Sequence, residues 1–98
     1  MTDAPALEAV RLFVSGRVQG VWFRGWVIES AERLGLRGWV RNRSDGRVEV
    51  LLVGPAAHVE AMAAACRDGP RAARVARVER VVAEAREAGA GFAQRPTL

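Results

Sequence analysis

Apolar side chains recur along the first third of this chain with two different periods. Over residues 10–14 they alternate with polar side chains, which is typical of a strand that buries one face. Over residues 23–34 they return every three or four positions, which predicts an amphipathic helix with Gly35 as its left-handed cap. The chain is therefore expected to begin with a flexible leader over residues 1–9, followed by a strand, a loop and a helix.

The rest of the chain repeats these patterns between clear turn residues. Residues 44–46 (Ser-Asp-Gly) signal a hairpin turn, and Pro55 stands where a helix favours its first residue. Gly69 and Pro70 stop that helix. In chain order, the expected elements are a strand over 36–41, a strand over 47–53, a helix from Pro55, a strand over 74–83 with poor alternation, and a short edge strand over 92–95.

This order, β-α-β-β-α-β with a short tail, predicts an α+β fold. Its natural packing is a ferredoxin-like sandwich, in which a four- to five-stranded antiparallel sheet carries both helices on one face. Residues 10–98 are expected to form this single domain. The helical crossover makes the first two strands parallel, with the third strand between them. Asn42, which ends the second strand, should then lie on the order of 10 Å from the loop after the first strand.

Composition narrows the possible chemistry. Half of the residues are hydrophobic, which argues against disorder, and the net charge of +4 comes from 15 arginines with no lysine. Because the arginines are scattered, most are expected on a solvated face, and the missing lysine excludes a nucleotide-triphosphate P-loop. Cys66 is the one cysteine, so an internal disulfide and a cysteine-cluster metal site are excluded. The longest apolar run, residues 50–57, contains glycine and proline, so we expect a cytoplasmic protein with no membrane partner.

Three other side chains with possible chemistry have ordinary explanations. His58 lies on the first turn of the second helix with no second ligand group beside it, so it is expected at the surface. Cys66 falls on the apolar stripe of the same helix and is expected in the core. Asp45 is expected to form the hairpin turn, although its place near the end of the second strand would allow it to tune a site there.

The loop between the first strand and the first helix is the strongest candidate for a binding site. Gly16 opens it and Gly20 closes it, and Arg24 follows in the first turn of the helix. Several backbone N–H groups and the positive end of the helix dipole meet at such a place, which favours anions and phosphate above all. The arginine adds a planar fork that matches two phosphate oxygens. An ordinary turn with an incidental surface arginine fits this stretch as well.

Two segments of the chain together resemble the acylphosphatase family. Both occur in that family's order and spacing, and the resemblance extends from Val10 to Thr97. Trp22 departs from the phenylalanine or tyrosine that is common there, and the strand over 74–83 is unusually rich in arginine. The residues that carry the resemblance are Val14, Gly16, Arg17, Val18, Gln19, Gly20, Val21, Phe23 and Arg24 in the first segment, and Gly38, Trp39, Val40, Arg41, Asn42, Asp45, Gly46, Val48 and Glu49 in the second.

The resemblance implies hydrolysis of acyl phosphates to a carboxylate and inorganic phosphate, without metal, cofactor or phosphoenzyme. Arg24 would bind the phosphoryl oxygens, and Asn42 would position the attacking water. Inorganic phosphate or sulfate would bind as a product-like ligand, and a monomer is expected. With no base evident near the loop, the water's proton could pass to a phosphoryl oxygen of the substrate. The phosphate-binding loop would supply backbone N–H groups from Arg17, Val18, Gln19, Gly20 and Val21.

Two other classes of function remain open at this point. One is a non-catalytic module of the same fold that binds phosphate or carbamoyl phosphate. The other is an RNA-binding domain, since RNA-recognition domains share this order of elements. Those domains need exposed aromatic side chains on the first and third strands, whereas this chain offers only Phe13 there, so no nucleic-acid partner is expected.

Overall fold

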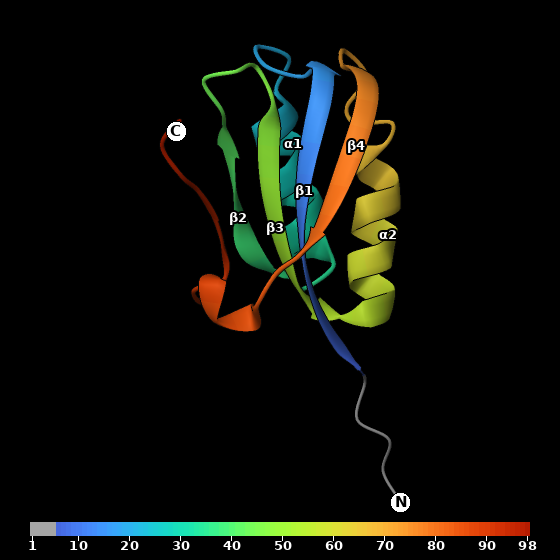
Figure 1. Cartoon of the computed structure of the whole chain (residues 1–98). Coiled ribbons are helices and arrows are strands. Elements are labelled where there is room, and N and C mark those ends of the chain that lie inside the picture. Colours follow the sequence, from blue (N-terminus) through green and yellow to red (C-terminus); the bar gives the residue numbers. More distant parts are fainter. Residues whose placement is uncertain (1–5) are drawn as a thin grey trace, which may run out of the picture.

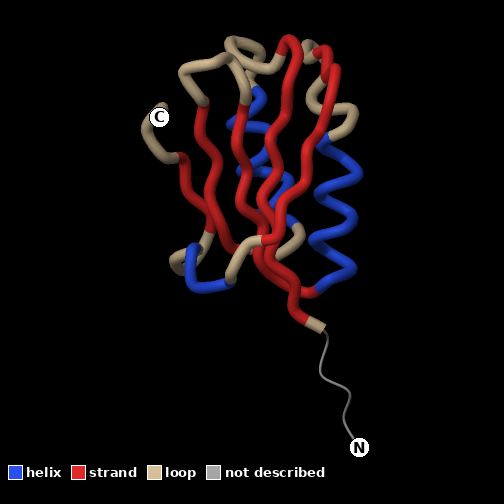
Figure 2. Tube along the Cα trace, in the orientation of Figure 1, coloured by secondary structure: helices blue, strands red, loops and turns tan. Residues whose placement is uncertain are grey.

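The protein folds as one sheet with two helices packed on it (Figures 1 and 2). A computed structural model describes residues 6–98. Neither α-helix of this described part is long and apolar enough to cross a membrane. In chain order, the elements are β1 (Leu7–Arg17), α1 (Phe23–Arg33), β2 (Arg37–Asn42), β3 (Val48–Pro55), α2 (Ala56–Cys66), β4 (Arg74–Val82), the short 3-10 helix η1 (Ala85–Glu87) and β5 (Phe92–Gln94).

The strands are arranged in the order β4-β1-β3-β2-β5. As predicted, β3 lies between β1 and β2 and is antiparallel to both, which confirms the ferredoxin-like sandwich. The sheet is mixed rather than wholly antiparallel, because β5 pairs parallel with β2. After β4 the chain crosses the lower end of the sheet through η1, so β5 starts at the same end as β2 and runs beside it (Figure 1).

The face of the sheet that carries the helices holds the main core. The alternating residues of β1, such as Leu12 and Val14, meet the apolar stripes of α1 and α2 there. Phe23, at the start of α1, is 1% exposed, and burying a side chain of that size stabilises the fold by about 1.5–3 kcal/mol. Its ring also meets that of Trp26, one turn later in α1, edge-on with centroids 5.4 Å apart. The burial of Phe23 in the core therefore fixes the beginning of α1 against the sheet.

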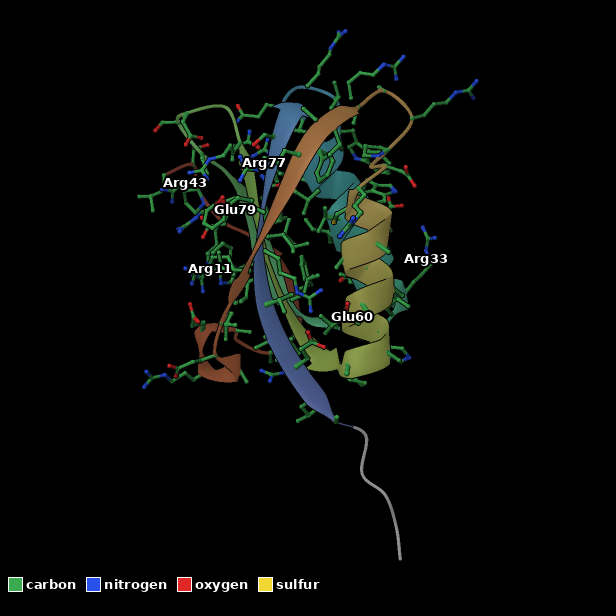
Figure 3. The ribbon with its side chains drawn as sticks, turned by 45° about the vertical axis from the view of Figure 1, so that its right-hand side comes forward. Arg11, Arg33, Arg43, Glu60, Arg77 and Glu79 are labelled. Carbon is green, nitrogen blue, oxygen red and sulfur yellow. The ribbon has the colours of Figure 1, made fainter. Side chains whose placement is uncertain are left out.

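The opposite face of the sheet carries neither α-helix. Ala83 and Ala88, on either side of η1, pack on its apolar residues, and arginine side chains cover the part around Glu49. Glu49 of β3 is only 1% exposed there, and guanidinium groups surround its carboxylate. The Nε atom of Arg41 lies 2.8 Å from Glu49 Oε1, and Arg43 and Arg11 contact the same carboxylate at 3.2 and 3.3 Å. Figure 3 labels both Arg11 and Arg43 on this side of the sheet, with Arg11 below Arg43. Alternation along β3 places Glu49 on this face, opposite to its neighbours Val48 and Val50, and the arginines account for its burial.

The two ends of β1 differ from the prediction. The strand begins at Leu7, because β3 extends as far as Pro55 and pairs with it, so residues 7–9 belong to the sheet and not to a leader. Residues 1–5 of the expected leader lie outside the described residues. At its other end β1 continues to Arg17, opposite Arg74, with a bulge at Ser15 and Gly16. The loop that leads to α1 is therefore shorter than its sequence suggests.

Candidate active site

A cleft of about 220 Å³ opens between the N-terminus of α1 and the neighbouring ends of β2 and β5. It lies at the edge of the sheet where the loop after β1 meets the helix. These two segments are at the upper end of Figure 2. Arg24 and Asn42, which are 18 positions apart in sequence, both line it, as the topology predicted. The lining residues are Val18, Gly20, Trp22, Phe23, Arg24, Gly25, Asn42 and Gln94.

The N-terminus of α1 presents its backbone donors to this cleft without competition. Trp22, the N-cap residue, has φ 64° and ψ 24° and makes no side-chain capping bond, and the first turn holds no acidic residue. The first internal helix bond runs from the Trp26 N–H to the Trp22 carbonyl at 3.0 Å. The N–H groups from Trp22 to Gly25 therefore have no partner within the helix. Together with the helix dipole, they make this end of the cleft a site for an anion.

Arg24 is the one charged side chain that lines the cleft among the described residues. No carboxylate and no imidazole lines the cleft there, so its guanidinium has no anionic neighbour in the wall. A guanidinium is permanently charged and carries its donors in one plane, which suits two oxygens of a phosphoryl group. The geometry and the charge of the cleft therefore both favour a phosphorylated ligand over a cationic or purely apolar one.

Only some residues of the phosphate-binding loop proposed from the sequence line the cleft. Val18 and Gly20 line the cleft, and Val18 is buried. Arg17 belongs to β1 and lies opposite Arg74 across the bulge, while Val21 packs against the core. Neither is among the residues that line the cleft, so a contribution from their backbone N–H groups stays a prediction.

Gln19, the remaining residue of that loop, uses its side chain to fasten the loop to the β2–β3 hairpin. Its Nε2 donates to the Arg43 carbonyl at 2.8 Å and to the Arg47 carbonyl at 2.9 Å. The hairpin is itself held by Asp45, whose side-chain oxygen accepts the backbone N–H of Arg47 at 3.0 Å. That hydrogen bond is the largest cause of a lowered pKa at Asp45, which confirms this residue as a turn former. Gln19 thus sets the distance between the loop and the end of β2.

Asn42 carries the clearest sign of a missing partner in the cleft. It is the last residue of β2, and its backbone carbonyl accepts the N–H of Leu98 at 3.2 Å. Its side-chain Oδ1 is buried and has no hydrogen-bond partner within residues 6–98. Buried acceptors are rarely left unpaired in native proteins, so this oxygen calls for a donor that arrives with the ligand or solvent.

The sequence did not single out Trp22, Gly25 or Gln94 as parts of the cleft wall. The indole of Trp22 is 59% exposed and lies against Gly25, where a Cβ would be 2.1 Å from the indole Nε1. A close approach of ring to backbone therefore requires glycine at position 25. The glycine in the first turn of a helix was an available signal for this contact. Gln94 could not be found in this way, because it enters the cleft only through the parallel pairing of β5 with β2.

The other residues that were considered lie outside the cleft. His58 is on the first turn of α2, at the other end of the sheet, and is exposed. Cys66 is fully buried, as predicted, and this burial raises its pKa to about 12. In the described part of the chain, no three His, Cys, Asp or Glu side chains gather where they could hold a metal ion.

Several known proteins with similar sequences and structures are acylphosphatases. The model of the acylphosphatase family matches residues 10–94. The acylphosphatase of Rhodospirillum rubrum is 58% identical over 92 residues, which covers 94% of this chain and 100% of that protein. That of Rhizorhabdus wittichii is 50% identical over 101 residues, covering 98% and 96%. The crystal structure of the Bacillus subtilis acylphosphatase superimposes with a TM-score of 0.84 at 36% identity, covering 92% of this chain and 99% of that one. The chain is a member of the acylphosphatase family.

Proposed function

We propose that the cleft hydrolyses the carboxyl–phosphate bond of acyl phosphates and releases a carboxylate and inorganic phosphate. Family membership and the names of the close relatives support this activity. The single observation that carries the site assignment is that Arg24 and Asn42, whose buried Oδ1 has no partner within residues 6–98, line one cleft at the N-terminus of α1. These relatives do not favour the alternative of a non-catalytic module that binds phosphate or carbamoyl phosphate.

In this proposal the phosphoryl group binds between Arg24 and the backbone donors. The guanidinium fork takes two phosphoryl oxygens, and N–H groups of the loop and of the first helical turn take the others. Charge in phosphoryl transfer is spread over these oxygens, so fixed donors stabilise the transition state where the charge lies. Loss of one such preorganised donor typically slows an enzyme by roughly 100- to 1000-fold.

Asn42 positions the nucleophile. Its Oδ1 accepts a hydrogen from a water molecule, whose oxygen then attacks phosphorus in line with the acyl oxygen. The new P–O bond forms as the acyl P–O bond breaks, and the carboxylate leaves with the electron pair of that bond. The proton of the water passes to a phosphoryl oxygen, since the described wall of the cleft offers no carboxylate or imidazole as a base. A carboxylate is a good leaving group, so the reaction needs little general-acid help.

We further propose that one copy of the chain is sufficient, as a cytoplasmic monomer without a cofactor or a nucleic-acid partner. All the residues in these proposed roles come from one chain. The substrate is a small acyl phosphate, and inorganic phosphate, or sulfate in its place, competes for the same donors.

The test is hydrolysis of benzoyl phosphate in excess EDTA by the wild type, Arg24→Gln and Asn42→Ala, with His58→Gln as the control outside the cleft. We expect EDTA-insensitive turnover that falls by at least about 100-fold in both cleft variants and is unchanged in the control. Circular dichroism checks that each variant is folded. A folded wild type that binds phosphate without turning over benzoyl phosphate would support the non-catalytic module instead.

A further inference from the structure

Gln94 of β5 shares a wall of the cleft with Asn42. In the parallel pairing of the two strands it lies in register with Val40, two residues before Asn42. Residues in register point to the same face, and Val40 belongs to the core on the helix side of the sheet. The next residue, Arg95, points the other way and stacks over Trp39 on the open face, with its guanidinium carbon 4.7 Å from the ring centroid. The side chain of Gln94 therefore lies on the same side as that of Asn42.

The two amide side chains are close enough to hold one small molecule between them. One inter-strand step and a two-residue offset place their Cα atoms roughly 8 Å apart. Both line the cleft, and Gln94 makes no side-chain hydrogen bond to another of the residues 6–98. At this separation a single water molecule can bridge the two side-chain amides, and the amides do not need to touch each other.

The attacking water needs a second polar partner besides Asn42. A water that only donates to the buried Oδ1 of Asn42 can still rotate about that hydrogen bond. A second hydrogen bond fixes the direction of its lone pair, and a misplacement of about 1 Å can cost roughly 100-fold in rate. The amide of Gln94 can donate or accept a hydrogen bond, so it can bind the water whether the water turns a hydrogen or a lone pair toward it.

We propose that Gln94 is a second water-positioning residue, which holds the nucleophile together with Asn42; this inference rests on the proposed function. Water attached to the strand wall attacks the phosphorus from that side. The acyl group then leaves on the opposite side, toward the mouth of the cleft where Trp22 is exposed. Gln94 consequently acts on the rate of the chemical step and makes no contact with the phosphoryl oxygens.

The test compares Gln94→Met, which keeps the length of the side chain and removes the amide, with the wild type. We expect kcat for benzoyl phosphate to fall by roughly 10- to 100-fold, while KM and the inhibition constant of inorganic phosphate stay within about twofold. Arg95→Gln, on the other face of the same strand, should leave both kinetic constants unchanged. An unchanged kcat in Gln94→Met, or a change confined to KM that indicates contact with the acyl group, would overturn the proposal.

A double variant separates positioning of one shared water from two independent effects. If both amides hold the same molecule, Asn42→Ala with Gln94→Met should be no more than a few fold slower than Asn42→Ala alone. Full multiplication of the two losses contradicts the shared water. The outcome is distinguishable from failure of the proposed function, because the wild type and the Arg24→Gln variant decide that question in the same assay.

Discussion

The N-termini of α1 and α2 are alike in local features but differ in what surrounds them. Both helices have 11 residues, both lack a side-chain cap, and neither has an acidic residue in its first turn. They pack on the same face of the sheet and begin at opposite ends of it (Figure 1). Only the beginning of α1 lines the cleft that holds an unpartnered buried amide oxygen. A helix dipole by itself therefore does not account for the site.

The beginning of α2 is occupied by the chain itself. β3 runs directly into the helix, and its last residue, Pro55, has no N–H group to offer. The N–H of Ala56 donates to the carbonyl of Ala6 at 2.8 Å, which uses a further donor. At α1 the chain instead arrives through a loop, keeps its first N–H groups free, and places Arg24 in the first turn. Free donors, a cation and a facing strand end together distinguish the two places.

The strongest test of this difference is to change the residue at the second position of each helix. Arg24→Lys keeps the charge but loses the planar fork, and we expect kcat/KM for benzoyl phosphate to fall by about 100-fold or more. Ala57→Arg places an arginine at the second residue of α2, where Arg24 stands in α1. It should create no second phosphate site, because Pro55 has no N–H group, the N–H of Ala56 is used by Ala6, and no strand end faces the two donors that remain. Calorimetric titration with inorganic phosphate measures the stoichiometry, and a second bound phosphate in Ala57→Arg would contradict our explanation.

The glycines that precede the two helices should differ in their cost to stability. A Cβ at Gly16 would lie 2.2 Å from the Arg74 carbonyl oxygen and 2.7 Å from the Ala76 nitrogen, and its φ of 123° disfavours other residues. Because these atoms are backbone, we expect Gly16→Ala to lower the free energy of unfolding by about 2–4 kcal/mol.

Gly54→Ala is the matched variant before α2. Its Cβ would lie 2.6 Å from Cδ2 of Leu36, the far end of a flexible side chain, so the expected loss is less than about 1.5 kcal/mol. Urea unfolding measures both variants. Equal losses would mean that the bulge beside Gly16 can shift as easily as a leucine side chain.

The exposed ion pairs of Glu60 in α2 and Glu29 in α1 should contribute differently to stability in acid. Glu60 of α2 accepts hydrogen bonds from Arg80, one of them 2.9 Å long, and these are the largest cause of a pKa lowered from 4.5 to about 2. A carboxylate with a lowered pKa stabilises the fold above its ordinary pKa, and this contribution is lost as the pH falls from 4.5 toward 2. Glu8 partly opposes it, because its hydrogen bond with Glu60 raises the pKa of Glu8. Figure 3 labels Glu60 on α2, and its carboxylate pairs with Arg80 of β4.

Replacement of Glu60 by glutamine should therefore flatten the fall in melting temperature between pH 4.5 and 2. Glu29→Gln in α1 is the control, since its ion pair with Arg33 is exposed, 3.6 Å long and expected to contribute little. Thermal unfolding across this pH range measures both. An identical acid profile for the wild type and Glu60→Gln would show that the Arg80 contact carries no stability.

The smallest effect on the protein is expected from labelling of Cys66, at the end of α2. Because burial raises the pKa of the Cys66 thiol to about 12, roughly one molecule in ten thousand carries the reactive thiolate at pH 8. A disulfide reagent should therefore label Cys66 rapidly in the unfolded protein and very slowly in the native protein. The native protein should keep its activity during this treatment. Rapid labelling under native conditions would indicate that the last turn of α2 opens often.

Sequence patterning predicted the elements that depend on neighbouring residues. The start of α1 at Phe23, the two inner strands and the turn at Asp45 follow from periodicity and turn chemistry within a few positions. The topology of these elements was sufficient to bring Arg24 and Asn42 to one edge of the sheet. Local signals failed at Leu7, where the extension of β1 depends on the length of β3.

The sequence by itself determined the order of the elements and the loop before α1, and it predicted which residues bind phosphate. Only the tertiary structure decided that β5 runs parallel to β2 and brings Gln94 to the cleft, and that arginines bury Glu49 on the open face. It also decided that Gln19 fastens the loop to the hairpin. Helix and strand periods are set by residues a few positions apart, whereas these contacts depend on the register between segments far apart in the chain.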